Sequence, residues 1–504
     1  MSKKVRVRFA PSPTGGLHIG GVRTALYNYL FAKHQGGDFI LRIEDTDQTR
    51  FVPGAEEYIM ECLQWCGIQP DESPAKPGAF APYRQSERKE LYRQYAEQLV
   101  TSGNAYYAFD TTDELDAKRK AVPNFQYNHA ERSGMKNSLS LSADETASLL
   151  QQKTPHVIRI KMPENADIHF TDMIRGEVTF HSALVDDKVL LKADGMPTYH
   201  LAVVVDDYLM EVTHAFRGEE WLPSAPVHIL LWQYLFGLEN MPQWAHLPLI
   251  LKPDGNGKLS KRDGDRLGFP VFAMNWTDPR SNEFTQGFRE KGFLPEAFIN
   301  MLAMLGWNDG TDKEIFALEE LVQSFSMERV HKGGAKFDYE KAKWFNHEWI
   351  KKLNAERLKQ KAKAEFEKNG IVIDDDNKLE KVIELIKDRC TLLPDFVQQG
   401  SFFFQMPADI DTSAVKPKWD EKKNLFFAEL IRAYELMQLW QHNDLETSFK
   451  EMAAAHQIKP GEVLLPFRIM LVGGKFGPGV FDIAVVLGKV GTIGRIKNLL
   501  HLMK

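Results

Sequence analysis

The sequence predicts an α/β protein: a parallel sheet forms the first half, an α+β insertion interrupts that sheet, and all-α helical bundles follow. Three observations carry this prediction. Residues 5–43 have the order strand, glycine-rich turn, helix and strand, which is a βαβ unit and implies parallel pairing. Residues 201–205 form a continuous apolar run, as expected of a strand that is covered on both faces. Beyond about residue 270, apolar residues recur mainly at helical spacing.

The composition fits a folded protein of several domains. The chain has 504 residues, of which 43% are hydrophobic and 26% charged, which excludes a collagen, a disulfide-stapled miniprotein and a disordered tail protein. Three cysteines are too few for a disulfide framework or a four-thiolate zinc site, which favours a reducing compartment. No apolar stretch reaches the roughly 18 residues of a membrane helix, and no signal peptide follows the basic start. We therefore expect a soluble, cytoplasmic protein without a membrane segment.

The first unit of the predicted sheet begins with the alternating strand Val5–Phe9. A turn-rich stretch at 11–16 ends it, a helix starts near Gly20, and a second strand covers Phe39–Ile43. Ligands of parallel sheets bind at the carboxyl ends of the strands. The segments that follow the two strands, the second of them Glu44–Asp47, are therefore expected to line a site.

The remaining elements are expected in chain order. Residues 105–120 are polar and are expected to be helical, and strands at 157–161 and 177–180 are assigned to the insertion. Strand signals resume at 189–191 and 201–205, and Asp206 and Asp207 end the second of these strands. Another strand at 212–216 and a helix at 221–236 follow. Amphipathic helices are then expected at 353–368, 379–389, 422–440 and 480–502.

Two segments carry recognisable chemistry. Residues 10–21 place a turn before a helix N-terminus, where free N–H groups and the helix dipole favour a phosphate, and His18 can donate to a phosphate oxygen. Gly20 and Gly21 lack side chains, which permits close approach of a nucleotide. Residues 255–262 form a glycine loop with the cations Lys258, Lys261 and Arg262. Each segment alone is typical of a turn or a solvated face. The pair, His18-Ile19-Gly20-Gly21 and Lys258-Leu259-Ser260-Lys261-Arg262, resembles the two signatures of class I aminoacyl-tRNA synthetases.

The resemblance is most specific to the bacterial-type glutamyl-tRNA synthetases. It is carried by six ordered segments: Arg8–Gly15, Leu41–Asp47, Pro82–Arg88, Asp194–Ala202, Arg217–Trp221 and Lys258–Arg262. The resemblance implies a Rossmann-type catalytic domain at 1–105 and 190–265, split by an acceptor-end-binding insertion at 106–189. It further implies a stem-contact helical domain at 266–336 and a helical anticodon-binding region of two bundles at 337–504.

The family resemblance also implies an activity and its substrates. ATP with Mg²⁺ would activate L-glutamate as an adenylate, and the glutamyl group would pass to the 3′-terminal ribose of tRNA(Glu), in a protein that acts as a monomer. The implied catalytic residues are His18, Lys258, Lys261 and Arg262. The implied glutamate-binding residues are Arg8, Ala10, Ser12, Glu44, Tyr199 and Arg217. The implied ATP-binding residues are His18, Gly20, Glu220, Ile250, Lys258, Leu259, Ser260 and Lys261.

Charge fits these residue types to glutamate, because Arg8 and Arg217 can each form a bidentate pair with a carboxylate. The family resemblance implies which arginine meets which carboxylate: we favour Arg8 for the side-chain carboxylate and Arg217 for the α-carboxylate. Glu44, with Ser12, can accept the ammonium group. The Tyr199 hydroxyl can donate to the side-chain carboxylate.

The helical second half is expected to bind tRNA. The net charge of −6 does not favour nonspecific binding to nucleic acid but permits a local basic groove. Lys341, Lys343 and Trp344 mix cations with an aromatic ring, as RNA-binding surfaces do, and Arg389 is a candidate anticodon reader. Some relatives carry a zinc knuckle in the insertion, but residues 106–127 contain no cysteine, so no structural zinc is expected.

Three positions depart from the family pattern. Gly21 replaces the final histidine of the first signature, and Arg262 replaces the final serine of the second. Val203 stands where some relatives carry a substrate-contacting asparagine. The alternatives are a glutaminyl-tRNA synthetase, whose second half would be a β-barrel, a short paralogue that modifies a tRNA base, a nucleotidyltransferase and a catalytically inactive tRNA-binding paralogue. The sequence leaves open whether tRNA(Gln) is also charged.

Overall fold

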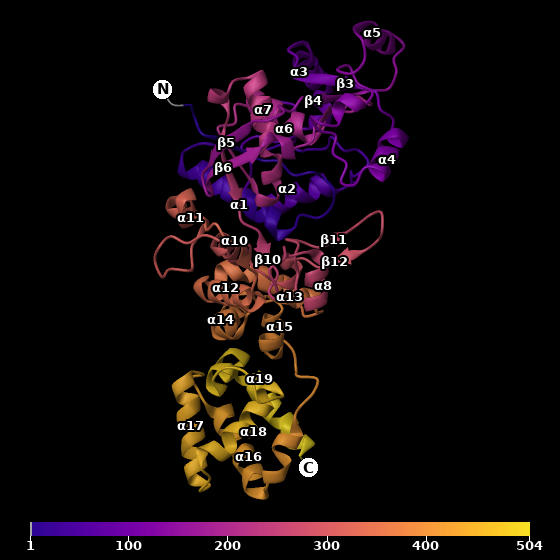
Figure 1. Ribbon diagram of the computed structural model, residues 1–504. Helices are drawn as coiled ribbons and strands as arrows, with labels where there is room; N and C mark the ends of the chain where they lie inside the picture. Colours follow the sequence, from indigo (N-terminus) through magenta and orange to yellow (C-terminus); the bar gives the residue numbers. More distant parts are fainter. Residues whose placement is uncertain (1–2, 504) are drawn as a thin grey trace. The chain divides into compact units, whose positions relative to one another are not determined.

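The computed structural model describes residues 3–503, which form two compact units (Figure 1). Unit 1 comprises Met1–Glu290 and Phe298–Tyr339, and unit 2 comprises Lys291–Ala297 and Glu340–Lys504. Each unit is described by itself below. No helix within residues 3–503 has the length and apolar character that crossing a bilayer requires.

Unit 1 is built on a six-stranded sheet with the order β2-β1-β8-β9-β5-β6. The strands are β1 (Arg6–Phe9), β2 (Asp38–Leu41), β5 (Asp167–Asp172), β6 (Gly176–His181), β8 (His214–Gly218) and β9 (Gln243–Leu247). Every neighbouring pair is parallel except β5 and β6, which form an antiparallel hairpin. The register places Arg217 of β8 beside His246 of β9. The predicted parallel sheet is thus confirmed, with its first two strands and the strand near 212–216 as expected.

Helix α1 (Ile19–His34) packs on this sheet at β1, β2 and β8, and α7 (Ala225–Leu235) packs on it at β5. Helix α6 (Tyr199–Leu209) packs on α3 (Lys89–Thr101) and α7, and α2 (Ala55–Trp65) follows β2 in the chain. The alternating pattern of β1 does not give it a solvent face, because Arg6 and Arg8 are as buried as Val7. Both arginines can be buried because each is paired with carboxylates.

The strand predicted at 201–205 is wrong, because these residues lie inside helix α6. Leu201, Ala202 and Val203–Val205 are all buried, so the apolar run reflects a helix that is covered on every side. Periodicity cannot separate a short buried strand from a buried helix. Asp206 and Asp207 therefore do not end a strand but lie in the last turns of the helix, and both are buried.

A separate three-stranded sheet with the order β3-β4-β7 lies within the segment between α3 and α6. Its strands are β3 (Ala105–Ala108), β4 (Val157–Ile160) and β7 (Val189–Leu191), and helices α4 (Thr112–Ala121) and α5 (Ala143–Gln151) accompany them. The helix expected over 105–120 is wrong for its first residues, which form β3, because Tyr106 and Phe109 pack inside the protein. The strand at 177–180 is confirmed as β6, but it belongs to the six-stranded sheet and not to this smaller one.

The last part of unit 1 mixes short strands and helices. Its elements are β10 (Ile250–Leu251), α8 (Lys261–Leu267), β11 (Trp276–Thr277), β12 (Phe284–Thr285), α9 (Phe288–Lys291), α10 (Pro295–Met304), α11 (Leu318–Ser324) and β13 (Ala335–Lys336). The domain boundaries at 105, 189, 265 and 336 remain predictions.

Unit 2 consists of helices, and residues 340–503 contain no strand. The helices are α12 (Tyr339–Lys352), α13 (Ala355–Lys368), α14 (Asp376–Ile386), α15 (Asp395–Gly400), α16 (Glu421–Leu436), α17 (His442–Ala455), α18 (Pro460–Val472) and α19 (Val480–Leu502). Helices are confirmed at all four predicted places as α13, α14, α16 and α19, but α19 is kinked at Gly488, where φ is 75°, and has no distinct apolar face. A helical second half argues against the β-barrel that a glutaminyl-tRNA synthetase would carry.

Candidate active site

A cavity of about 1110 Å³ opens at the carboxyl ends of the parallel strands of unit 1. The segments that follow β1, β2, β8 and β9 supply most of its wall, together with the first turns of α1 and α6 and the loop at 258–260. This is where a parallel α/β sheet binds its ligand. The cavity therefore lies where the βαβ pattern of the sequence places a site.

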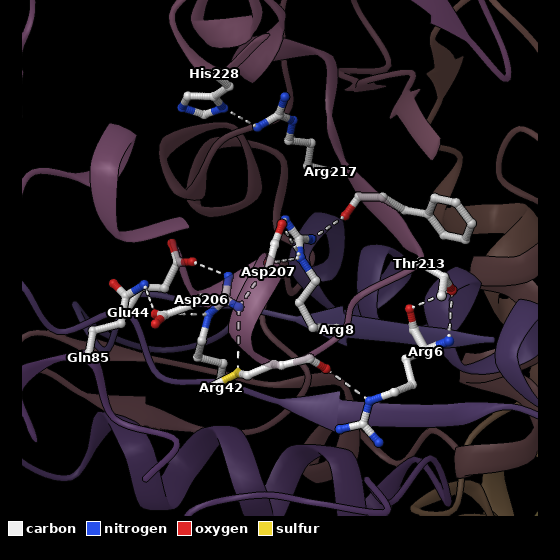
Figure 2. A network of polar contacts seen from close by, with 12 residues as sticks. Arg6, Arg8, Arg42, Glu44, Gln85, Asp206, Asp207, Thr213, Arg217 and His228 are labelled. Carbon is white, nitrogen blue, oxygen red and sulfur yellow. Dashed lines mark hydrogen bonds and ion pairs between the residues drawn. The ribbon is translucent and has the colours of Figure 1, made fainter. Parts of the chain in front are cut away.

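The floor of the cavity holds a buried network of arginines and carboxylates (Figure 2). Asp207 lies between two arginines, with an oxygen 3.0 Å from Arg8 Nε and 2.8 Å from Arg42 Nη1. Asp206 accepts from Arg88 Nε at 2.8 Å and from the Tyr92 hydroxyl at 2.8 Å. Both aspartates come from α6, whereas Arg8 lies in β1 and Arg42 directly follows β2, so the network joins helix to sheet.

The network is balanced in formal charge. Arg8, Arg42 and Arg88 face Asp206, Asp207 and Glu44, whose carboxylate lies 3.1 Å from Arg42 Nη2. Burial by itself would raise the pKa of Asp207, but the charges of Arg8 and Arg42 outweigh it and hold that pKa below its usual range. Buried ions are tolerated when they are paired in this way.

Glu44 differs from the two aspartates because it also lines the cavity. Burial raises the pKa of the Glu44 carboxyl, and the charges of Arg42 and Arg8 oppose that shift without cancelling it. An incoming cation would relieve this unfavourable burial. Glu44 is therefore suited to accept an ammonium group, with Ala10 and Ser12 on the same wall.

Arg217 is a buried cation of the cavity wall whose hydrogen-bond partners are all neutral groups. Its Nε donates to His246 Nε2 at 3.0 Å, and its Nη1 donates to the Tyr199 hydroxyl at 3.1 Å and to His228 Nδ1 at 3.0 Å. Within the described part of the chain, no carboxylate lies within ion-pair distance of it, and the buried Nη2 has no hydrogen-bond partner. A buried cation without a counter-ion is unfavourable unless a ligand supplies one. Arg217 is therefore well suited to bind an anion.

His18 sits at the N-cap of α1, as predicted. Its Nδ1 accepts from the Gly20 backbone N–H at 3.1 Å, which leaves the proton of the neutral ring on Nε2. Burial, with a smaller contribution from the Lys258 charge, lowers the pKa of His18 to about 4, so the ring is neutral near pH 7. The buried Nε2 has no partner among residues 3–503. It is thus a free donor beside a helix N-terminus, which suits a phosphate oxygen.

Two of the three cations at 258–262 are paired with carboxylates, and the last two of the three lie at the start of α8 rather than in a loop. Lys258 Nζ lies 2.5 Å from a carboxylate oxygen of Glu220, and Lys261 Nζ lies 2.9 Å from Glu283. Arg262 is exposed. These are surface pairs, which contribute little to stability and can be exchanged for a stronger anion.

The structure brings most of the predicted residues together. The cavity wall includes Arg8, Ala10, Ser12, His18, Gly20, Glu44, Tyr199, Arg217, Glu220, Ile250, Lys258, Leu259 and Ser260. Lys261 and Arg262 do not line it. Trp221 lies on the wall, with its ring 4.6 Å from that of Tyr199, and it is not the core residue that a tryptophan at this point of a helix usually is.

The comparison with known proteins agrees with this geometry. Residues 4–344 match the family described as tRNA synthetases class I (E and Q), catalytic domain, and residues 340–500 match an anticodon binding domain. The chain belongs to the class I tRNA synthetases.

Relatives resemble this synthetase over its full length. It is 54% identical over 505 residues to the glutamate–tRNA ligase of Flavobacterium johnsoniae, with 99% of each chain covered. It is 52% identical over 508 residues to that of Christiangramia forsetii, with 100% of each covered. The crystal structure of a glutamate tRNA ligase from Elizabethkingia meningosepticum in complex with its amino acid matches with a TM-score of 0.95 at 48% identity, covering 100% of both chains.

The synthetase site contains functional candidates that the sequence prediction missed. They are Arg42, Asp172, Asp206, Asp207, His228 and His246. One signal was available: two adjacent aspartates at the end of an apolar run are unusual, because charged residues are rarely fully buried without partners. The histidines gave no signal, since each is one polar residue in an apolar segment until the register of the sheet is known.

The structure shows what surrounds two of the three positions that depart from the family pattern of this synthetase, Gly21 and Val203. A Cβ at Gly21 would come within 2.7 Å of Leu17 Cδ1, so a larger residue there requires Leu17 to move. Val203 is 2% exposed, packs in the core and is not part of the cavity wall. The contact that an asparagine makes in some relatives therefore has no direct equivalent here.

The predicted tRNA-binding residues lie in unit 2 of the synthetase. Lys341 Nζ lies 3.7 Å from the centre of the Trp344 ring, and Lys343 is paired with Glu340 at 2.8 Å. Arg389 is exposed at the end of α14. Burial, and then the nearby Arg389 charge, lower the pKa of Arg468, so two cations lie close together there. Closely spaced cations favour an anionic partner.

Within residues 3–503, no group of three or more His, Cys, Asp or Glu side chains is arranged to hold a metal ion. A buried carboxylate joins several parts of the insertion. Asp187 accepts from the Tyr106 hydroxyl at 2.7 Å, from Arg132 Nη1 at 3.2 Å and from the Met162 backbone N–H at 3.0 Å.

Proposed function

We propose that this chain is a glutamate–tRNA ligase, which uses ATP to attach L-glutamate to the 3′-terminal ribose of tRNA(Glu). One observation carries the proposal: a single cavity contains a buried arginine that lacks an anionic partner and a neutral histidine donor at a helix N-terminus. The first suits a substrate carboxylate and the second a phosphate. Full-length similarity to glutamate–tRNA ligases supports glutamate as the amino acid.

Two arginines would receive the two carboxylates of glutamate. We expect Arg217 to bind the α-carboxylate and Arg8 to bind the side-chain carboxylate. Arg8 already donates to Asp207 and to a backbone carbonyl, but its guanidinium has further N–H groups that can donate to the substrate. The oxygen of Tyr199 accepts from Arg217, so its O–H remains available to donate to a carboxylate. Burial raises the pKa of Tyr199, which keeps this proton on the hydroxyl. Glu44 would take the ammonium group.

The first step needs no enzyme nucleophile. The glutamate α-carboxylate attacks the α-phosphorus of ATP, and the bond from that phosphorus to the oxygen that bridges to the β-phosphorus breaks. Pyrophosphate is released, and the product that remains is glutamyl-adenylate. Catalysis of such a step depends on positioning and on stabilising charge. His18 would donate its Nε2–H to a phosphate oxygen. Lys258 and Lys261 would release the side chains of Glu220 and Glu283 and bind the triphosphate instead. Arg262 would also contact the triphosphate.

Gly20, Ile250, Leu259, Ser260 and Glu220 line the part of the cavity where the nucleotide would lie. Magnesium ion, when bound with ATP, shields the triphosphate charge. In the second step, the 2′-hydroxyl of the terminal ribose attacks the acyl carbon and displaces AMP. We further propose that the insertion binds the acceptor end of the tRNA and that unit 2 binds its anticodon. Lys341, Lys343, Trp344 and Arg389 are the candidate contacts in unit 2.

Pyrophosphate exchange tests this function. We expect glutamate-dependent ATP–pyrophosphate exchange with purified protein, and we expect it to require added tRNA, with glutamine and aspartate as inactive controls. Exchange with glutamine in preference to glutamate would overturn the choice of amino acid. Absence of exchange while tRNA still binds would identify the chain as an inactive tRNA-binding paralogue. Cytoplasmic location, a monomeric state and the absence of zinc stay predictions.

A further inference from the structure

The hydrogen bonds around Arg217 come from neutral groups of three different elements. His246 lies beside it on β9, Tyr199 and His200 begin α6, and His228 lies on α7. The face of the Trp244 ring lies under the guanidinium, with Cζ 4.8 Å from the ring centre. Arginine donates from every nitrogen and cannot accept, so each neighbour must present a lone pair to it.

That requirement fixes the tautomer of His246. Its Nε2 must accept from Arg217 Nε at 3.0 Å, so the ring proton is on Nδ1. Nδ1 in turn lies 2.6 Å from Asp172 Oδ2. Burial alone would raise the pKa of Asp172, but the hydrogen bonds from His246 and from the Arg175 backbone N–H lower it, so this carboxylate accepts. Arg217 therefore donates to His246, and His246 donates to Asp172, so the hydrogen bonds run in one direction from the guanidinium to the carboxylate.

His228 is fixed by the same reasoning. Its Nδ1 accepts from Arg217 Nη1, so its proton is on Nε2, which lies 3.2 Å from His200 Nδ1 and donates to it. Two imidazoles thus hold the guanidinium in place without neutralising it. The nearest carboxylate in this chain of contacts, Asp172, is separated from Arg217 by a whole imidazole ring.

We propose that Asp172 and His246 are positioning residues for glutamate binding: they orient Arg217 through a neutral imidazole, so that its charge stays available for a carboxylate of the substrate. This inference rests on the proposed function. A direct carboxylate on Arg217 would orient it equally well but would compete with the substrate, as Asp207 does for Arg8. A neutral acceptor, itself held by a carboxylate behind it, gives the orientation without that competition.

The arrangement implies a pH dependence. An imidazolium has no lone pair, so protonation of His246 or His228 would remove an acceptor and place a second cation beside Arg217. Burial and Arg217 lower the pKa of both rings, and Asp172 opposes this at His246. Arg8, Arg175 and the rings of His200 and His228 are the other titratable neighbours, and Lys188 faces His200.

The test is a comparison of His246→Leu with His246→Gln in tRNA charging. Leucine removes the acceptor, whereas the glutamine side-chain oxygen can accept from Arg217. We expect the leucine variant to raise the KM for glutamate about ten- to a hundredfold, with the KM for ATP changed by less than about twofold. The glutamine variant should recover part of the loss. His169→Leu, at an exposed histidine on β5, is the matched control.

The pH profile adds a readout that a merely structural role would not move. The wild-type KM for glutamate should be flat from pH 8 to about 6 and rise below it, although both substrate carboxylates stay ionised above about pH 5. In His246→Gln the rise should be smaller, because one of the titrating rings is gone.

The outcomes separate this inference from the proposed function. A wild-type protein that attaches no glutamate to tRNA refutes the proposed function. A protein that charges glutamate normally while His246→Leu keeps the wild-type KM refutes the positioning role and leaves the function intact. If the leucine variant fails to fold, the positioning role is tested instead with the Asp172→Asn variant and with ¹⁵N spectra of the wild-type histidines. An Nε2-protonated neutral ring at His246 would overturn the proposal, because that ring cannot accept from Arg217.

Discussion

The two arginines of the proposed glutamate site differ in what already neutralises them. Arg8 shares its charge with Asp207, whereas Arg217 contacts only neutral acceptors. Side chains of the same type at the ends of neighbouring sheet strands therefore make different contributions to binding. In the proposed site we therefore expect Arg217 to supply most of the attraction for an anion, and Arg8 to supply direction through its fixed N–H groups.

This difference predicts different phenotypes. Arg217→Met should raise the KM for glutamate by about a hundredfold or more, because about 3 kcal/mol of charge-assisted hydrogen bonding is lost. Arg8→Ala should also lose glutamate activation, and it should lower the melting temperature as well, because Asp207 loses a partner. Pyrophosphate exchange and thermal unfolding measure the two effects. Arg280→Met, at an exposed arginine, is the control, and an Arg8→Ala protein of unchanged stability would contradict the argument.

The sequence predicts the residues of the cavity wall better than the residues behind them. His18, Glu44 and Arg217 were expected because they lie in segments that resemble a family with known chemistry. His246 and Asp172 were not expected, because their role depends on β8, β9 and β5 lying side by side. That pairing joins residues far apart in the chain, which no local pattern encodes.

At the scale of elements, the helix α6 links the site to the sheet. Its apolar residues pack in the core, and the two aspartates near its C-terminal end receive Arg8, Arg42 and Arg88. The sequence prediction made this segment a strand, because a run of five apolar residues is as compatible with a covered strand as with a covered helix. These residues form a helix that packs against α3 and α7. Such contacts join segments far apart in the chain, so a local pattern cannot predict them.

The link between α6 and the sheet can be tested by a mutant cycle. Arg42→Met leaves Asp207, Asp206 and Glu44 with too little positive charge in a site where Arg42 is fully buried, so stability should fall by about 3 to 5 kcal/mol. Combining it with Asp207→Asn should cost less than the sum of the single losses, because charge balance is restored. Urea unfolding of the full chain measures the cycle. Strict additivity would show that the two side chains do not act as a pair.

For the whole molecule, buried neutral histidines make stability depend on pH. Burial lowers the pKa of His18 and of His200 to about 4, against about 6.5 when the chain is unfolded. Below pH 6.5 the unfolded chain therefore binds protons that the folded chain does not. Stability is fully present above pH 6.5 and falls as the pH drops toward 4.

We expect a loss of up to about 2 kcal/mol for each of these two histidines between pH 7 and pH 5. Urea unfolding at the two pH values measures the loss. His200→Asn should flatten the dependence, whereas His169→Asn, at an exposed position, should leave it as in the wild type. An equal slope in the His200→Asn protein would exclude this source.

The balanced network on the cavity floor has a consequence for which amino acids the site admits. Three arginines against three carboxylates sum to zero within this network, and Arg217 adds beside it a buried positive charge that contacts no carboxylate among the described residues. A carboxylate of zwitterionic glutamate would supply the missing counter-charge. The neutral side chain of glutamine brings one carboxylate fewer, so we expect the site to discriminate against it by charge more than by shape. Aspartate has the same charge as glutamate, so only its shorter reach can exclude it.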